Sequence, residues 1–197
     1  MIQSKSDYKL YVKSDEIALG GVTLKTKIKS IFIPSIWKFE RKLRRLEYYL
    51  NCKSMFPLRN LIYWWLYFDF WRYSTKLGYT IPPNVFGPGL CICHIGTIVI
   101  NGDVRFGANA RIHAGINIGK YGREGNKSGV PKFGNNIYIG PGAKIFGDVI
   151  IGDNVAIGAN AVVTKNVPNH VTVAGVPAAV INERGSDGLV IYGYLKE

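Results

Sequence analysis

The chain has 197 residues, of which 47% are hydrophobic and 23 are glycine, and it carries a formal net charge of +12. This length suits one large domain or a repeat unit with a smaller partner, and the hydrophobic fraction excludes a disordered chain. No uninterrupted apolar run approaches the ~20 residues of a membrane span, and the opening MIQSKSDYKL lacks the order of a secretory signal. We therefore expect a cytoplasmic protein.

The positive charge is concentrated in the first part of the chain. Residues 1–80 contain 15 Lys and Arg against 6 Asp and Glu, a net of +9, whereas residues 81–197 contain 10 against 7, a net of +3. Such a balance first suggests nucleic acid as a partner, but no nucleic-acid motif accompanies it, so no such partner is predicted. An anionic membrane surface or an anionic substrate is the better match.

Residues 1–80 are predicted to form an N-terminal arm and a helical region. The polar residues 1–30 are ambiguous, with an arm or a short strand as the expectation. A first helix is predicted from about Ser35, which can cap it, to Leu50, with an apolar stripe on one face and basic side chains on the other. A second, densely aromatic helix is predicted over Leu58–Leu77.

The aromatic helix has two interpretations that do not exclude each other. Asp69 and Arg72 make it too polar to span a bilayer. It can pack against the following domain or a neighbouring subunit. Alternatively, residues 35–77 can make peripheral contact with the inner face of the membrane, where Trp and Tyr lie at headgroup level beside basic residues.

Residues 81–182 contain a six-residue repeat. Aliphatic or aromatic residues recur at every sixth position, glycine often follows them, and small or β-branched residues stand two places before them. Neither an α-helix nor a hairpin sheet has this period, whereas a solenoid with three short strands per coil does. The sequence therefore predicts an all-β solenoid, a parallel β-helix of hexapeptide repeats, whose core residues are Ile100, Phe106, Ile112, Ile118, Phe133, Ile139, Ile145, Ile151, Ile157 and Val163.

The repeat is interrupted at two places, where additional residues must leave the wall of the solenoid. Ile92 and Ile100 are eight residues apart, so two additional residues bulge out around His94. The next core position after Ile118 comes fifteen residues later, which we interpret as two hexads and three further residues. The segment 120–132, rich in glycine and charge, is therefore predicted to loop away from the coil.

Two of the three histidines are predicted to meet beside the first interruption. A coil of eighteen residues, or twenty across the bulge, places Ile92 beneath Ile112, and neighbouring coils are separated by roughly 4.8 Å. His94 and His113 then occupy adjacent columns. A histidine in an insertion beside a second one suits proton transfer, so His94 is the candidate catalytic residue, with His113 in a direct or a contact role. His170 is interpreted as a solvated turn residue.

The three cysteines have no metal-type spacing. Cys91 and Cys93 alternate along a predicted strand, so we interpret them as small strand side chains. No metal site is predicted.

The stretch CHIGTIVINGDVRFGANARIHAGINIG, followed by GPGAKIFGDVIIGDNVAIGANAVVTKNVPNHVTVAGVPAAVI, resembles the hexapeptide-repeat acyltransferases. The resemblance covers about residues 81–182 and is strongest to the serine acetyltransferase-like branch, which includes enzymes that O-acetylate capsular or O-antigen sugars. It implies a left-handed β-helix, a homotrimer, and acetyl-CoA as co-substrate in a groove between adjacent solenoids.

The resemblance also implies the identity of site residues. His94 matches the family histidine that acts as general base. Five positions match the coenzyme groove of related sugar acetyltransferases: Gly140, Pro141, Ala159, Thr164 and Lys165. Of these, Lys165 can reach the nucleotide phosphates as a point charge. Basic residues often seen after AGVPA are absent here, so the phosphates are expected to use other groups, among them Lys120, Arg123, Lys127 and Lys132.

The predicted acceptor rests on departures from the serine acetyltransferase pattern. Those enzymes present Asp-His at the bulge, Arg-His-Pro in the loop and a carboxylate fifteen residues before the base. Here Cys93, Gly129–Val130–Pro131 and Tyr79 stand at those places. A zwitterionic amino acid needs fixed charges, because a buried charge left unpaired is costly. We therefore predict a sugar hydroxyl of a surface polysaccharide or its precursor as the acceptor.

Three functions follow in order of preference. The first is acetyl-CoA-dependent O-acetylation of a polysaccharide sugar by direct transfer, with His94 as general base. The alternative is serine O-acetyltransferase of cysteine biosynthesis. A non-acetylating scaffold or a zinc hydratase is remote, because zinc needs three convergent ligands. Residues 183–197 give no prediction beyond a C-terminal tail.

Overall fold

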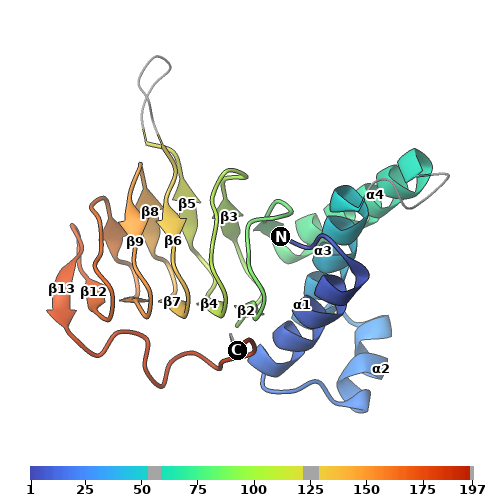
Figure 1. The fold of residues 1–197 in the computed structure, drawn as a ribbon, viewed down its shortest axis with the longest axis horizontal. Helices are drawn as coiled ribbons and strands as arrows, with labels where there is room; N and C mark the ends of the chain where they lie inside the picture. The colour runs from blue at the N-terminus through green and yellow to red at the C-terminus, as the bar shows by residue number, and fades with distance from the viewer. Residues whose placement is uncertain (53–58, 122–128, 196–197) are drawn as a thin grey trace.

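A computed structural model describes residues 1–52, 59–121 and 129–195 of the chain. Helices lie at one end and a tapering stack of short strands extends from them (Figure 1). The helices are α1 (Lys5–Ala18), α2 (Leu24–Phe32), α3 (Ile36–Asn51) and α4 (Arg59–Leu77). Within the described ranges, no helix is both long and apolar enough to cross a membrane.

The strands form three sheets that share one axis. The first has the order β1-β3-β5-β8-β11, the second β2-β4-β7-β10-β12-β13, and the third pairs β6 with β9. Across the described residues every ladder is parallel except that between β12 and β13, which closes the far end. The strand bounds are β1 (Tyr79–Thr80), β2 (Cys91–Ile92), β3 (Ile98–Ile100), β4 (Ala110–Ile112), β5 (Asn117–Gly119), β6 (Lys132–Phe133), β7 (Ile137–Ile139), β8 (Lys144–Phe146), β9 (Ile150–Ile151), β10 (Ala156–Ile157), β11 (Val162–Val163), β12 (Thr172–Ala174) and β13 (Ala179–Asn182).

The six-residue repeat forms the core, as predicted. All ten core positions predicted from the repeat are buried. They stack in columns: Ile112 pairs with Ile139 in register, Ile118 pairs with Ile145, and the rings of Phe106 and Phe133 stack with centroids 4.0 Å apart. The prediction of a parallel β-solenoid preceded by a helical region is therefore confirmed.

The structure confirms the predicted length of one of the two interruptions. Ile92 pairs with Ile112, twenty residues away, so the first bulge contains the two predicted additional residues. For the second, Ile112 pairs with Ile139 at a separation of 27 residues, whereas Ile139 pairs with Ile157 at 18. This coil is therefore nine residues longer than the next, since 27 − 18 is nine. The step from Ile118 to Phe133 is one hexad with nine further residues. The predicted two hexads and three residues are therefore wrong, although the segment 120–132 does contain the insertion.

Asparagines line one corner of the solenoid. Asn109, Asn136 and Asn154 have φ between 56° and 59°, a left-handed conformation that asparagine tolerates better than most residues. Each side-chain amide donates to the next asparagine, at 2.9 and 2.8 Å, and Asn154 Nδ2 lies 3.2 Å from His170 Nε2. His170 thus ends this ladder as an exposed turn residue.

Residues 1–30 form two helices rather than the predicted arm or strand. Ser4 and Thr23 cap α1 and α2 by accepting hydrogen bonds from the backbone N–H three residues later. α3 begins after Ser35, whose hydroxyl accepts from Lys38 N at 3.3 Å, as predicted. α4 is described from Arg59, and its predicted start at Leu58 lies outside the described residues.

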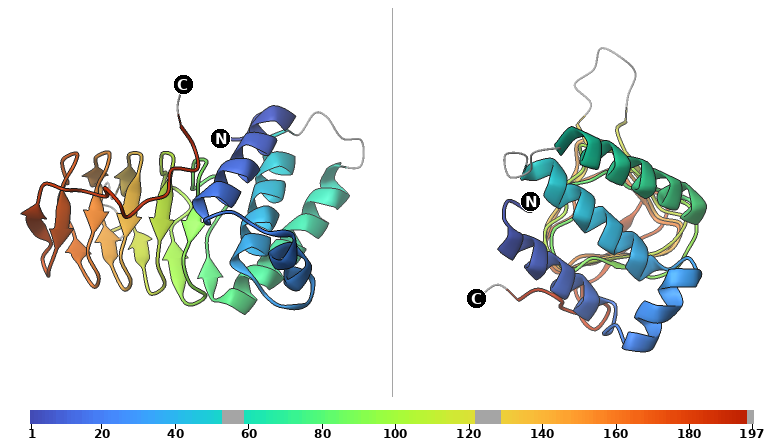
Figure 2. Two further views of the ribbon diagram at one scale, coloured as in Figure 1. Left: turned by 90° about the horizontal axis from the view of Figure 1, so that it is seen from below. Right: turned by 90° about the vertical axis from the view of Figure 1, so that its right-hand side faces the viewer.

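A buried charge cluster attaches the helices to the first coil. Arg44 of α3 is fully buried; its Nε lies 2.7 Å from Asp15 Oδ2 of α1, and its guanidinium donates to Glu47 Oε2 at 2.9 Å. The same guanidinium donates to the carbonyls of Phe86 and Gly87 in the first coil. α1 and α3 are thus tied to the first coil. Together with α4 they lie side by side across the end of the solenoid (Figure 2).

The C-terminal tail, whose structure was not predicted, runs back along the solenoid towards α1 (Figures 1 and 2). Ser186 Oγ donates to the carbonyl of Asn136 at 2.6 Å. Further along, Tyr194 N donates to Asn109 Oδ1, and Asn109 Nδ2 donates to the carbonyl of Tyr194, both at 2.8 Å. The tail therefore crosses several coils and ends near the helical region.

Candidate active site

The bulge between β2 and β3 presents His94 on the surface of the solenoid. The His94 side chain is exposed, and its ring centroid lies 5.6 Å from that of His113, the residue after β4. The ring of Tyr138 in β7 meets His113 edge-on at 5.3 Å. The structure thus brings the two histidines together, one coil apart, with an aromatic ring on the next coil.

Tyr79 holds the backbone of the bulge. Its hydroxyl donates to the carbonyl of His94 at 3.0 Å, and its ring packs edge-on against Phe39 of α3. Burial raises the pKa of Tyr79, so the phenol stays a hydrogen-bond donor. Tyr79 stands where the family carboxylate is expected, and it supports the backbone of His94 instead of its imidazole.

Cys93 and Arg111 form a polar pair beside the histidines. Arg111 Nε donates to Cys93 Sγ at 3.3 Å. A hydrogen bond from the Cys91 thiol, assisted by the hydrogen bond and the charge of Arg111, lowers the pKa of Cys93 to about 5. The interpretation of Cys93 as a small strand side chain is therefore incomplete. The sequence Arg111-Ile112-His113 could have predicted this contact. Ile112 points into the core, so the side chains of Arg111 and His113 both point outward, one coil away from Cys93.

Two buried polar atoms near the bulge have no hydrogen-bond partner among the described residues, Glu40 Oε2 and His113 Nε2. The other oxygen of Glu40 accepts from Ile92 N at 3.1 Å, so α3 supports the strand that leads into the bulge. Burial, with a smaller contribution from Asp15, raises the pKa of Glu40 well above its ordinary value. Burial also lowers the pKa of His113, which favours a neutral imidazole able to accept a proton.

The predicted coenzyme positions divide between two corners. Gly140, Pro141 and Ala159 lie at the corner that also holds the His94 bulge, since both the β7–β8 and β10–β11 connections turn there. Gly140 is packed so closely that a Cβ would lie 2.7 Å from Ala159 N. Thr164 and Lys165 are exposed at the next corner, after β11. The single chain does not bring these two groups together.

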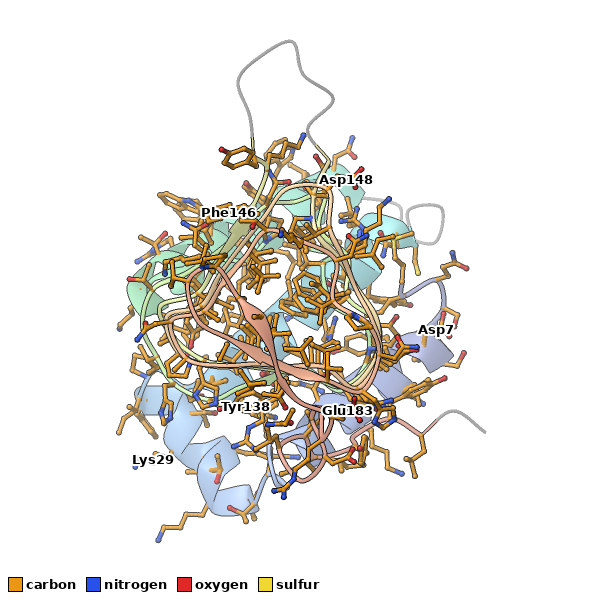
Figure 3. The ribbon with its side chains drawn as sticks, turned by 90° about the vertical axis from the view of Figure 1, so that its left-hand side faces the viewer. Asp7, Lys29, Tyr138, Phe146, Asp148 and Glu183 are labelled. Atoms are coloured by element: carbon orange, nitrogen blue, oxygen red, sulfur yellow. The ribbon has the colours of Figure 1, made fainter. Side chains whose placement is uncertain are left out.

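The two candidate phosphate ligands that the structure describes, Lys120 and Lys132, lie outside the corner of the His94 bulge. Lys120 pairs with Asp103 at 3.0 Å, and Lys132 is exposed in β6. Arg123 and Lys127 lie outside the described residues. Figure 3 looks along the solenoid. Tyr138, which contacts His113, lies on a face remote from Asp148 at the corner after β8.

In the part of the chain that the structure describes, no group of three His, Cys, Asp or Glu side chains is placed to hold a metal ion.

Comparison with known proteins identifies the repeat. Residues 131–165 match the family model described as bacterial transferase hexapeptide (six repeats). Over 104 residues, 53% of this chain, the sequence is 38% identical to serine acetyltransferases of Staphylococcus xylosus and Staphylococcus aureus (strain Mu50 / ATCC 700699). The chain spans about half the length of these curated relatives, 48%.

Solved structures extend the likeness to the helices. A serine acetyltransferase from Brucella abortus strain S19 superimposes with a TM-score of 0.71 at 25% identity, covering 92% of this chain and 71% of that one. The complex of that enzyme with coenzyme A gives 0.72 at 25% identity, covering 92% and 70%. The enzyme from Neisseria gonorrhoeae gives 0.69 at 26%, covering 91% and 67%.

These comparisons contradict the predicted polysaccharide O-acetylation, because the named relatives and structures are serine acetyltransferases. The prediction depended on the absence of charged side chains at three family positions. In the structure, however, Arg111, eighteen residues after Cys93, brings a charge to the same site. The sugar acceptor is therefore withdrawn.

The repeat, the parallel register and the superposition agree on one architecture, a left-handed β-helix with short helices before it. The solenoid of this chain is therefore similar to those of the hexapeptide-repeat transferases.

Proposed function

We propose that this protein is an acetyl-CoA-dependent serine O-acetyltransferase. The observation that carries the proposal is the His94–His113 pair, with ring centroids 5.6 Å apart, in the bulge of a solenoid that is 38% identical to serine acetyltransferases over 104 residues. His94 takes the proton of the serine hydroxyl as its oxygen attacks the thioester carbonyl of acetyl-CoA. The C–S bond breaks, and the CoA thiolate leaves and takes up a proton.

The charges at the site support an amino-acid acceptor. The Arg111 guanidinium can pair with the serine carboxylate, and the Cys93 thiolate can pair with the ammonium group. The two lie in hydrogen-bond contact at 3.3 Å, and the neutral His113 stands beside them with a free Nε2. Fixed opposite charges lower the cost of removing a zwitterion from water.

The coenzyme is proposed to bind at the corner formed by Gly140, Pro141 and Ala159. The small side chain of Ala159 and the backbone at this corner suit the narrow pantetheine arm, whereas Gly140 lacks a side chain because the next coil packs directly against it. Thr164 and Lys165 are at the next corner, so one chain alone does not enclose the coenzyme. We therefore propose a homotrimer in which the groove lies between adjacent solenoids, with Lys165 reaching the nucleotide phosphates.

The test is thiol release from acetyl-CoA by the purified full-length protein. L-serine should support turnover, whereas D-serine, free sugars and capsule oligosaccharides should not. His94→Ala should reduce the rate by on the order of 10²–10⁴-fold, the usual contribution of a positioned base, and His113→Ala by less. Unchanged circular dichroism and thermal midpoint would control for folding. Turnover of a glycan without turnover of L-serine would overturn the acceptor, and no acetyl-CoA consumption with any acceptor would overturn the reaction.

A further inference from the structure

A groove opens on the outer face of the helical layer, away from the solenoid. It lies between α2, α3 and α4, with a volume of about 600 Å³. Its lining includes the apolar residues Ile28, Leu66 and Trp37 and the basic residues Arg41 and Arg45. We call it the basic groove. It lies on the opposite side of α3 from the residues that hold the first coil, so the proposed reaction does not use it.

The basic groove has an excess of unpaired positive charge. Its two acidic neighbours are already neutralised: Glu16 pairs with Lys27 at 3.2 Å, and Asp69 pairs with Lys42. In the described part of the chain, Arg41 and Arg45 form no ion pair. Each guanidinium instead lies 5.9 Å from the ring of a tryptophan. The groove therefore offers free guanidinium groups on aromatic supports.

Exposed apolar side chains flank the basic groove on both sides. On α2, Ile31 is 65% exposed and Phe32 is 82% exposed. On α4, Trp65 and Phe68 are 60% and 55% exposed. A second hollow, lined by Trp65, Phe68 and Arg72, adjoins the first at Asp69. Apolar and aromatic side chains at this exposure, interleaved with cations, mark an interaction surface rather than an ordinary solvated face.

We propose that this face docks on an anionic phospholipid surface, with a headgroup phosphate in the basic groove. Arg41 and Arg45 bind the phosphate, while Phe32 and Phe68 enter the acyl boundary beside it. The chemistry is that of an interfacial helix, in which a basic face and bulky apolar residues act together. A two-fold contact with a second copy of this chain is the weaker alternative, because it would set these cations against one another. A heterologous contact with another copy is tested by the sedimentation measurement below.

The experiment is flotation of the full-length protein with vesicles of phosphatidylcholine alone or of phosphatidylcholine mixed with phosphatidylglycerol. Binding should require the anionic lipid and should be released at high salt, since screening weakens exposed charge attraction. The double variant Arg41→Glu/Arg45→Glu should bind at least roughly thirtyfold more weakly, from the usual contribution of each basic residue at an anionic surface. Its matched control, Lys9→Glu/Arg184→Glu, lowers the net charge equally at exposed side chains that do not line the groove, and it should bind like the wild type.

A second pair of variants tests the apolar part. Phe32→Ser/Phe68→Ser should reduce binding, whereas Ile150→Ser/Ile181→Ser, at exposed sites on the solenoid, should not. Equal losses in the two charge variants would show a net-charge effect and overturn the groove. Binding to phosphatidylcholine alone, or no binding to either vesicle, would overturn the proposal. A change of sedimentation size in Phe32→Ser/Phe68→Ser without vesicle binding would assign the face to self-association. All of these readouts are independent of acetyl transfer.

Discussion

At the scale of single residues, the site combines groups with opposite protonation preferences within one coil of each other. Burial keeps His113 neutral, whereas a thiol donor and a guanidinium keep Cys93 ionised. Neither residue is far from His94: one precedes it in the chain and the other lies one coil away. The two imidazoles and the thiolate–guanidinium pair divide the proposed work between proton transfer and acceptor binding.

The ionised state of Cys93 gives a prediction for alkylation by iodoacetamide. Because the pKa of Cys93 is lowered to about 5, its thiolate is present throughout the neutral range, and the alkylation rate should be almost flat between about pH 6 and 8. The alkylation rate of a thiol with an ordinary pKa would instead rise about tenfold for each pH unit across this range. Arg111→Met should move the midpoint upward, and Cys93→Ser should abolish the reaction, since Cys52 and Cys91 are buried.

The lowered pKa of Cys93 also makes the stability of the folded protein depend on pH. A depressed pKa means that the folded state binds fewer protons than the unfolded state between the two values, so the stabilisation is complete above the unfolded pKa and is lost as the pH falls through about 5. An alkylation rate that climbs steadily across neutral pH would show a protonated Cys93 and remove it as the proposed partner of the serine ammonium group.

At the scale of elements, the helical layer is held by a buried ionic contact rather than by apolar packing alone. Arg44 bridges α1, α3 and the first coil and has no exposed surface. A buried ion pair gives little net stability over an apolar replacement, but removing one partner leaves the other charges uncompensated. The attachment of the helices to the bulge therefore depends strongly on this one side chain.

Replacing Arg44 tests this attachment, and the same replacement at its neighbour Arg45 is the control. Arg44→Met leaves Asp15 and Glu47 buried without their cation and should cost about 3–5 kcal/mol in the free energy of unfolding by urea. Arg45→Met removes an exposed guanidinium and should change this free energy by less than about 1 kcal/mol. Equal effects of the two changes would contradict the bridging role of Arg44.

The elements differ in how far the sequence predicts them. The period of six has few structural solutions, so the solenoid, its core and the meeting of His94 with His113 all follow from counting. The attachment of α1 could not be predicted in this way, because it depends on Asp15, a charged residue whose burial no apolar pattern reveals. The Cys93–Arg111 contact joins residues on different coils and needs the twenty-residue register as well as side-chain direction. The phosphate ligands do not follow from one chain, because the proposed groove is formed by two.

The core of the solenoid offers a comparison between adjacent residues of β9. Ile151 is 1% exposed and faces the column of Phe133, whereas Ile150 is 57% exposed. Ile151→Asp would bury an unpaired carboxylate and should prevent folding, because its cost is comparable to the whole stability of a domain. Ile150→Asp should fold with a thermal midpoint close to the wild type. A soluble, cooperatively melting Ile151→Asp protein would refute the register.

At the scale of the whole molecule, the C-terminal tail joins parts that are distant along the solenoid. It leaves the far end after β13, contacts the carbonyl of Asn136, and reaches Asn109 near the helices. On the way, the carbonyl of Leu189 accepts from the guanidinium of Arg111 at 2.9 Å. The tail therefore fixes one end of Arg111 while Cys93 accepts from the other.

Removal of residues 188–197 tests this coupling. The truncated chain loses the two hydrogen bonds between Tyr194 and Asn109 and the Leu189 partner of Arg111, which together should cost about 1–3 kcal/mol. For a chain of this length, that corresponds to a fall in the thermal midpoint of roughly 2–10 °C. The KM for L-serine should rise more than kcat falls, because Arg111 is proposed to bind the acceptor and takes no proton. Leu195→Ala, at a side chain that is 75% exposed, is the control and should change neither quantity. A truncated protein with unchanged melting and an unchanged KM would show that the tail rests on the solenoid without positioning Arg111.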